Sequence, residues 1–441
     1  MWTRSLAGVF SLWLLTQCGY SQEIEESGPE RSESLPVSML NHLAEVCRSE
    51  GKLEEAESLY SRAVQLASSS KNVQEVILAS ILTNQGRLFQ QQRKYDKAEL
   101  NFPEALAIQE RAYGTHDPEF LNSLNNLAAL YYLKGNFTAS QQLSRRAIDS
   151  LQEITSPEGT LLATALNNAG AALAAQGKWG QAETFYRRAL SIYEKRLGRS
   201  HADYFTCLEN WACLLAQHNK FEEARKVTVE VVAARLRILG PEHLSLAVSF
   251  NNLARYDYAL RRFDQAQENY RKAINLREKI SGRMDPELAT VLLNLAELDR
   301  KQGRMDEAEK NLRRAMEIQS ATLGEMHPTM ATLLNNWGQL ARAKYLDREA
   351  EDAFRRALEI ADKSLGPDHP LVATILNNLS NLMIAHGRYL EAEPSLLRAL
   401  GIREKAEPRN NPDLIRTLAD YKRLQGFIGQ TIHVKDPQKT P

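Results

Sequence analysis

The sequence predicts an all-α solenoid of about nine tandem two-helix units, and three observations lead to this fold class. Asparagine recurs at a constant 42-residue interval through most of the 441-residue chain. The chain holds only 15 prolines and 22 glycines, fewer than an all-β protein with many turns needs. A charged fraction of 25%, with abundant Ala, Leu, Glu, Arg and Gln, suits exposed helices.

The charge balance bears on the kind of partner. Lys plus Arg and Asp plus Glu both total 55, so the formal net charge is zero. A neutral chain lacks the positive field that draws a protein to nucleic acid or to an anionic membrane surface. We therefore expect a protein or peptide partner and no nucleic acid.

The N-terminus, residues 1–21, is typical of an export signal. Arg4 supplies a positive charge, and an apolar run from Leu6 to Leu15 follows it. This run is too short to span a bilayer, and cleavage after Ser21 would leave small residues at the recognition positions. We expect an exported protein (secreted, periplasmic or envelope-associated) without a membrane span. A lipid anchor at Cys18 is the alternative, although Gln17 fits a lipoprotein signal poorly.

The next segment, residues 22–35, reads "QEIEESGPERSESL" and predicts a flexible acidic tether. The repeats begin after it, and they are expected over residues 36–426. Asparagines mark them at a 42-residue spacing. We call this set the asparagine column: Asn84, Asn126, Asn168, Asn210, Asn252, Asn294, Asn336 and Asn378.

Two further columns hold small residues at the same spacing. The first runs Ala56, Ala98, Ser140, Ala182, Ala224, Ala266, Ala308, Ala350 and Ala392. The second lies seven residues further on: Ala63, Ala105, Ala147, Ala189, Val231, Ala273, Ala315, Ala357 and Ala399. Small side chains are expected where helices pack closely, because a larger one would hold the backbones apart.

Each unit is expected to form two helices. In the last copy, Ile375, Leu376, Leu379 and Leu382 form an apolar face at helical spacing, "HGRY" interrupts the pattern, and a second amphipathic run follows. One such pair cannot bury its apolar face alone, so neighbouring pairs must stack. A capping helix is expected near Leu414 to Leu424, and residues 427–441 are expected to form a loose C-terminal tail.

Several motifs resemble the tetratricopeptide repeat (TPR) family. A Gly, an aromatic residue and an Ala follow the first helix in "GKWGQA" (177–182) and "GRYLEA" (387–392), and "GNF" (135–137) begins the same way. The usual unit has about 34 residues. The 42-residue unit, with "LNNLA", "RAL" and "LG..HP", is similar to the kinesin light chain and nephrocystin-like branch. This resemblance implies a right-handed solenoid whose first helices line a concave groove.

A column of histidines, His201, His243, His327 and His369, could be taken for metal ligands. Neighbouring repeats lie about 8–10 Å apart, too far for histidines one repeat apart to share a metal readily. Because His327 and His369 precede a helix-starting Pro, as Asp117 and Asp285 do in other copies, we expect a capping role instead. No catalytic or phosphate-binding motif is present, so the sequence predicts no enzyme, cofactor or metal.

The asparagine column has two possible roles. Its amides could contact the backbone of a peptide in the groove, with specificity from Arg87, Arg255 and Lys301, and from Glu297 and Gln339, on the same face. Alternatively, they could bond across to the adjacent repeat and fix the register between units. The two roles are compatible.

The function hypothesis is therefore a non-enzymatic interaction scaffold that binds an extended peptide or a partner helix in the groove. Two alternatives stay open: a kinesin light chain-like cargo adaptor, and a structural member of an envelope or multiprotein assembly that uses the convex face.

Overall fold

The structure is a computed structural model, and it describes residues 36–69, 75–153, 159–406 and 411–435. These residues form 19 α-helices and no strand, which confirms the all-α prediction. Across the same residues, no helix combines the length and the apolar character needed to cross a membrane. The expected signal peptide (1–21) and acidic tether (22–35) lie outside the described residues.

The helices follow one another as nine pairs and one terminal helix. We call the first member of each pair helix A and the second helix B. The A helices are α3 (Val37–Ser49), α5 (Glu75–Gln91), α7 (Pro118–Leu133), α9 (Thr160–Ala175), α11 (Ala202–Gln217), α13 (Leu244–Ala259), α15 (Pro286–Lys301), α17 (Pro328–Ala343) and α19 (Pro370–Ala385). The B helices are α4 (Leu53–Ser69), α6 (Tyr95–Tyr113), α8 (Phe137–Gln152), α10 (Trp179–Leu197), α12 (Phe221–Leu239), α14 (Phe263–Ser281), α16 (Met305–Thr322), α18 (Asp347–Leu365) and α20 (Tyr389–Ala406). The terminal helix is α21 (Pro412–Lys435).

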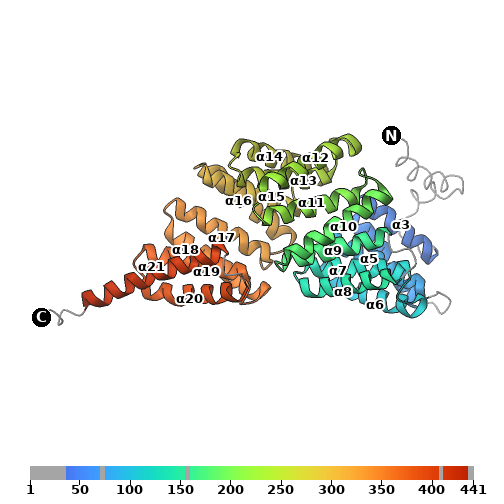
Figure 1. The fold of residues 1–441 in the computed structure, drawn as a ribbon, viewed down its shortest axis with the longest axis horizontal. Coiled ribbons are helices and arrows are strands. Elements are labelled where there is room, and N and C mark those ends of the chain that lie inside the picture. The colour runs from blue at the N-terminus through green and yellow to red at the C-terminus, as the bar shows by residue number, and fades with distance from the viewer. Residues whose placement is uncertain (1–35, 70–74, 154–158, 407–410, 436–441) are drawn as a thin grey trace. The chain divides into compact units, whose positions relative to one another are not determined.

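The chain divides into two compact units, Met1–Asn210 and Trp211–Pro441, and the division falls within α11. From α3 to α10 in the first unit and from α12 to α21 in the second, each helix packs against the next one along the chain (Figure 1). This is the stacking that the 42-residue period predicts, because each pair buries its apolar face against its neighbours.

The two small-residue columns lie where the helices come closest. Every member of both columns, from Ala56 and Ala63 in the first pair to Ala392 and Ala399 in the ninth, has 0% of its surface exposed. A larger side chain at these positions would separate the backbones. The prediction of close packing at these columns is confirmed.

Close approach also explains three glycines inside A helices. A Cβ on Gly86 would lie 2.6 Å from the Phe102 ring, and one on Gly338 would lie 2.6 Å from the Phe354 ring. A Cβ on Gly170 would lie 3.0 Å from the ring of Tyr186. In these pairs, helix B has an aromatic ring that occupies the space of the missing side chain.

The turn between helix A and helix B requires a left-handed backbone. Glycine supplies it in five copies, for example at Gly303 with φ 78°. Where glycine is replaced, Arg93, Asn219, Arg261 and Tyr345 adopt the same conformation with φ between 58° and 61°. The turn therefore keeps its left-handed backbone in every copy, even at non-glycine residues, for which this conformation is strained.

The expected capping role of the histidine column is confirmed. His327 Nδ1 accepts a hydrogen bond from the backbone N–H of Thr329 at 3.2 Å, and His369 Nδ1 accepts one from Leu371 at 3.1 Å. Asp117 does the same in the third copy. Each of these side chains satisfies one of the free N–H groups in the first turn of an A helix.

Helix α21 covers the last repeat, where a cap was expected near Leu414 to Leu424. Leu424 is fully buried in the apolar core of the eighth and ninth copies. The ring of Phe427 stacks on Tyr389 of α20 with centroids 5.0 Å apart. The helix continues to Lys435, past residue 426, where the expected tail begins.

Candidate functional site

The asparagine column lies in the middle of the A helices from α5 to α19. All eight side chains are half-buried, so each is partly accessible and partly packed against a neighbouring helix. Mid-helix Asn is unfavourable in isolation, by roughly half a kcal/mol relative to Ala. The hydrogen bonds that these side chains make to neighbouring helices offset this cost in helix propensity.

Most of the column donates to the preceding repeat. The Nδ2 groups of Asn84, Asn210, Asn294 and Asn378 donate to the Oδ1 atoms of Asn41, Asn167, Asn251 and Asn335, at 3.2, 2.9, 3.1 and 2.8 Å. Asn168 Nδ2 donates to the backbone oxygen of Asn125 at 3.2 Å. In each case the two residues are 43 positions apart, so the bond ties adjacent A helices together. We call this set of bonds the amide ladder.

The ladder extends into the cap. Asn377 and Asn381 of α19 both donate to Asp420 Oδ2 of α21, at 3.3 and 3.0 Å. Asp420 lies 42 residues after Asn378 and therefore occupies the next position of the asparagine column. The terminal helix thus meets the array at the same pair of positions, 43 residues apart, but with the direction of the hydrogen bond reversed.

In two places the ladder bond is absent because the acceptor position does not hold asparagine. Thr83 and Leu293 stand where other copies have an acceptor asparagine. Asn126, which follows Thr83, has a buried Nδ2 without a hydrogen-bond partner in the described residues. Asn336, which follows Leu293, donates to the carbonyl of Thr332 in its own helix at 2.9 Å. Every side-chain to side-chain bond of the amide ladder therefore joins two asparagines, while Asn168 uses a backbone oxygen.

The amide oxygens of the ladder donors remain available. The Oδ1 atoms of Asn84, Asn168, Asn210, Asn294 and Asn378 accept no hydrogen bond from the described residues and are not buried from solvent. Each amide therefore uses its donor within the array and presents an acceptor to solvent. A backbone N–H of a bound peptide is a suitable donor for such an oxygen.

A row of small polar side chains lies one turn before the asparagine column. It consists of Ser38, Ser80, Asn122, Thr164, Thr206, Val248, Thr290, Thr332 and Thr374, all exposed or half-buried. The hydroxyls of Thr206 and Thr374 donate to the carbonyl four residues earlier in their own helix. Val248 is 40% exposed and interrupts the row in the sixth copy.

The variable residues of this face differ in their accessibility. Arg255 and Lys301 are exposed, and Arg87 is half-buried. Glu297 already accepts hydrogen bonds from Arg300 at 2.8 Å and from the Tyr258 hydroxyl at 3.4 Å. Burial, followed by the neighbouring Glu297 carboxylate, raises the pKa of Tyr258 to about 12, so its hydroxyl stays protonated and donates.

In the first copy, Glu45 of α3 is held in place from two sides. It accepts hydrogen bonds from Arg48 Nη2 at 2.5 Å and from the Tyr60 hydroxyl at 2.8 Å. Burial alone would raise the pKa of Glu45, but the hydrogen bonds from Arg48 and Tyr60 lower it overall. The carboxylate is therefore charged and already has partners, which makes it an anchor of the fold and not a free acid.

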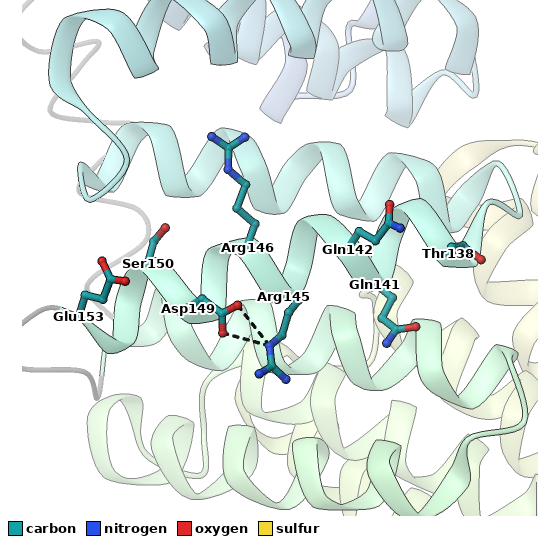
Figure 2. A pocket seen from close by; sticks show the side chains of 8 residues that line it. All are labelled: Thr138, Gln141, Gln142, Arg145, Arg146, Asp149, Ser150 and Glu153. Carbon is teal, nitrogen blue, oxygen red and sulfur yellow. Dashed lines mark hydrogen bonds and ion pairs between the residues drawn. The ribbon is translucent and has the colours of Figure 1, made fainter.

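The structure also contains a feature that sequence reasoning missed. A depression of about 550 Å³ lies along α8 between Thr138 and Glu153, and Figure 2 shows Arg145 turned toward Asp149 there. A second depression of about 580 Å³ lies along α16, from Asp306 to Glu317. Its residues occupy the same positions of the 42-residue unit, four repeats later. We call this surface of the B helices the helix B face.

The helix B face could have been found from the sequence through the repeated "RRA" motif, which places two arginines side by side on α8 and on α16. Arg146 and Arg314 reach back to Glu110 and Glu278 of the preceding B helix, at 2.5 and 2.6 Å. Arg145 and Arg313 pair within their own helices. The arginines are thus neutralised by neighbouring carboxylates.

With this architecture in view, the chain is similar to known repeat proteins. A family model for the tetratricopeptide repeat matches residues 36–111, 77–153, 161–235, 229–279, 287–345 and 329–405. These matches cover well over half of the chain, so it belongs to the tetratricopeptide repeat family. Proteins of this fold are typically binding scaffolds, and their repeats form surfaces for protein–protein interaction.

Several solved structures are similar to the chain. BtubC (BKLC) from P. vanneervenii is 25% identical, covering 53% of this chain and 92% of that chain, with a TM-score of 0.43. Repeats of a putative kinesin light chain from Podosopora anserina are 17% identical, covering 46% and 95%, with a TM-score of 0.39. A Rap protein complexed with Competence and Sporulation Factor is 12% identical, covering 91% and 98%, with a TM-score of 0.54. No curated protein matches the sequence.

Proposed function

We propose that the chain is a non-enzymatic scaffold that binds an extended peptide or a partner's helix along the A helices. The observation that carries this proposal is the set of solvent-accessible amide oxygens, one in each of five copies, whose Nδ2 groups are already committed to the ladder. Because the Nδ2 hydrogen bond already holds each side-chain amide in place, the side chain loses little conformational freedom when a peptide N–H binds to its Oδ1 atom.

Specificity would come from the variable residues on the same face. Arg255 and Lys301 are exposed and positively charged, so they favour a ligand with acidic side chains in the second unit. Asn126 and Asn336 make no bond to the preceding repeat among the described residues, and we include them and Asn252 in the proposed contact surface with the rest of the column.

The test distinguishes contact with a peptide from a role in fixing the register between adjacent repeats. Replacing Asn210 and Asn294 by Ala removes both the ladder bonds and the accessible oxygens. Replacing Asn167 and Asn251 by Ala breaks the same two bonds but leaves the oxygens of Asn210 and Asn294 in place. Partner proteins would be captured from the source cells with the wild-type chain, identified by mass spectrometry, and then measured for binding to each variant.

We expect the first variant to bind its partner at least about tenfold more weakly than the second, with similar losses in melting temperature for both. Equal binding by the two variants would show that the asparagines only fix register. A replacement of Arg255 and Lys301 by Ala, which leaves the ladder intact, provides a third comparison for the same face.

The helix B face is a second candidate surface, favoured by the equivalent depressions on α8 and α16. A structural assembly protein would use this face. Crosslinking of the bound partner distinguishes the two: contacts confined to Arg145 and Arg313 would support the helix B face and contradict groove binding.

We also propose that the chain is exported and that residues 1–21 are removed. The support is the positive charge at Arg4 followed by the short apolar run to Leu15. N-terminal sequencing of the mature protein should begin at Gln22. A mature chain that begins with a lipid-modified Cys18 would establish the anchor instead, and an intact N-terminus in the cytoplasm would contradict export.

A further inference from the structure

The first A helix has an apolar side that is less buried than the same side in any other copy. Among the residues that the structure describes, no helix precedes α3, and Met39 and Val46 of α3 are half-buried. The residues at these two positions are buried in all eight later copies, from Ile81 and Leu88 in α5 to Ile375 and Leu382 in α19. We call the side of α3 that carries Met39 and Val46 the open end.

In later copies, helix B of the preceding copy packs at these positions. Ile375 and Leu382 of α19 belong to one apolar core cluster with Ile360 of α18. A second cluster joins α17 to Ile318 of α16 in the same way. The open end is therefore a site for a segment that takes the position of a helix B.

The 42-residue register extends into the residues before α3. Ile24 lies 42 positions before Leu66, and it is the counterpart of Ile318 and Ile360. Seven of the nine copies carry Ile or Leu at this position, and both of these counterparts are buried. The register thus gives Ile24 the role of the apolar side chain that covers the next A helix.

An ion pair between successive B helices follows the same register. Three copies have an acid at the position of Glu26 and an arginine 36 residues later, at the position of Arg62. In each of them the two side chains pair: Arg146 with Glu110 at 2.5 Å, Arg314 with Glu278 at 2.6 Å, and Arg398 with Asp362 at 2.6 Å. Glu26 and Arg62 are the remaining instance of this spacing and register in the chain.

We propose that residues 22–35 fold back on the open end in the position of a helix B. In this arrangement Ile24 lies on Met39 and Val46, and Glu26 pairs with Arg62 of α4. The sequence predicts a flexible acidic tether over these residues, and the proposal gives that tether a docking site on its own chain. Both contact residues follow Ser21, so they remain if residues 1–21 are removed.

The covalent link to α3 favours this segment over a separate molecule. It keeps the segment at a high effective concentration, so the contact needs less surface than an interface between two molecules. An exposed ion pair contributes little free energy by itself. Ile24 therefore supplies most of the attraction, and Glu26 fixes which residues meet.

Carbodiimide crosslinking of the whole chain tests where the segment lies. The reagent joins a carboxylate to a lysine amine without a spacer, so the Arg62→Lys variant shows which carboxylate lies against this position. We expect mass spectrometry to find the introduced amine joined to Glu26 at least about tenfold more often than to Glu30 or Glu33 of the same segment. The positive control is Arg146→Lys, because Glu110 lies beside Arg146 in the structure.

Three outcomes would overturn the proposal. Equal coupling to Glu26, Glu30 and Glu33 would show a free tether. Coupling between isotopically labelled and unlabelled chains would show that a second copy covers the open end. A reaction in Arg146→Lys without any product between position 62 and residues 22–35 would show that the segment does not dock.

Hydrogen exchange tests the apolar contact separately. Ile24→Asp should accelerate amide exchange in α3 at least about threefold, with α19 as the internal reference. The matched control is Ile24→Leu, the residue that α4 carries at this position as Leu66, and it should leave the exchange unchanged. Unchanged exchange in Ile24→Asp would contradict docking. Neither measurement involves a bound peptide, so the result is independent of groove binding.

Discussion

At the scale of single residues, the A-helix caps link stability to pH. His369 accepts the N–H of Leu371 through Nδ1, which is possible only when that nitrogen is unprotonated. Burial lowers the pKa of His369, so the fold favours its neutral form. The stabilisation is therefore present above the unfolded pKa of about 6.5 and is lost as the pH falls through the folded pKa.

We predict that His369→Asp reduces the loss of melting temperature between about pH 7.5 and pH 5.5, because a carboxylate still caps there, as Asp117 does. Thermal unfolding at both values measures this. His386 acts in the opposite direction, since the Leu382 carbonyl and then Asp347 raise its pKa. The variant is therefore compared with wild type at each pH, and an unchanged pH dependence would contradict the capping account.

The interhelix turns allow a second prediction. Tyr345 has φ 61° and is 89% exposed, so it keeps a strained backbone while its side chain packs little. Tyr345→Gly should raise the free energy of unfolding by about 1 kcal/mol. Asn219→Gly is the control and should gain less, because asparagine tolerates the left-handed region better. Urea denaturation measures both, and equal gains would contradict this explanation.

At the scale of helices, two A helices carry a buried acid that replaces an apolar residue. Asp257 of α13 is fully buried and accepts from Arg225 Nε at 2.5 Å and from Asn269 Nδ2 at 3.0 Å. Asp299 of α15 accepts from Asn311 in the same way. The fifth copy has Leu215 and Val227 at these positions.

We predict that Asp257→Leu alone destabilises the protein by about 2–3 kcal/mol, because the buried amide of Asn269 loses its acceptor. Adding Asn269→Val, which restores the apolar pair of the fifth copy, should recover most of this loss. Urea denaturation of the two variants gives the comparison. A double variant less stable than the single one would show that the acid contributes more than local pairing.

The helices were also the level at which sequence reasoning was most accurate. The 42-residue period located both helices of every copy and both buried small-residue columns, because close packing admits only small side chains there. The apolar surface of α20 was not predicted. Leu390 and Leu397 are exposed because no other described helix covers this side of α20. The repeat pattern alone does not predict which sides of a helix are covered.

At the scale of the whole molecule, each of the two compact units is a chain of nearest-neighbour helix contacts, and α21 closes the second unit. Stability in such arrays is local, because each repeat contacts mainly the next. Asp420, Leu424 and Phe427 are the contacts through which α21 holds the ninth copy.

We predict that removing residues 407–441 accelerates amide hydrogen exchange in α19 and α20 and leaves the A and B helices of Met1–Asn210 unchanged. Hydrogen-exchange mass spectrometry measures this helix by helix. A uniform acceleration along the chain would mean that the array unfolds as one cooperative body, contrary to the nearest-neighbour description.

The sequence by itself determined the helical repeat, its period, its turns and its caps. These depend on local spacing and on residue size, which recur identically in each copy. It identified the asparagine column but left its partner open between a peptide and the next repeat.

Only the tertiary structure decided how the amides divide their hydrogen bonds. Side chains of adjacent A helices meet at an offset of 43 residues, one more than the repeat, because the stacked helices place each asparagine beside the residue preceding its equivalent. That offset is a property of helix packing and not of the sequence period. It commits the Nδ2 groups of five copies to the array and leaves the Oδ1 atoms of those five without a donor among the described residues.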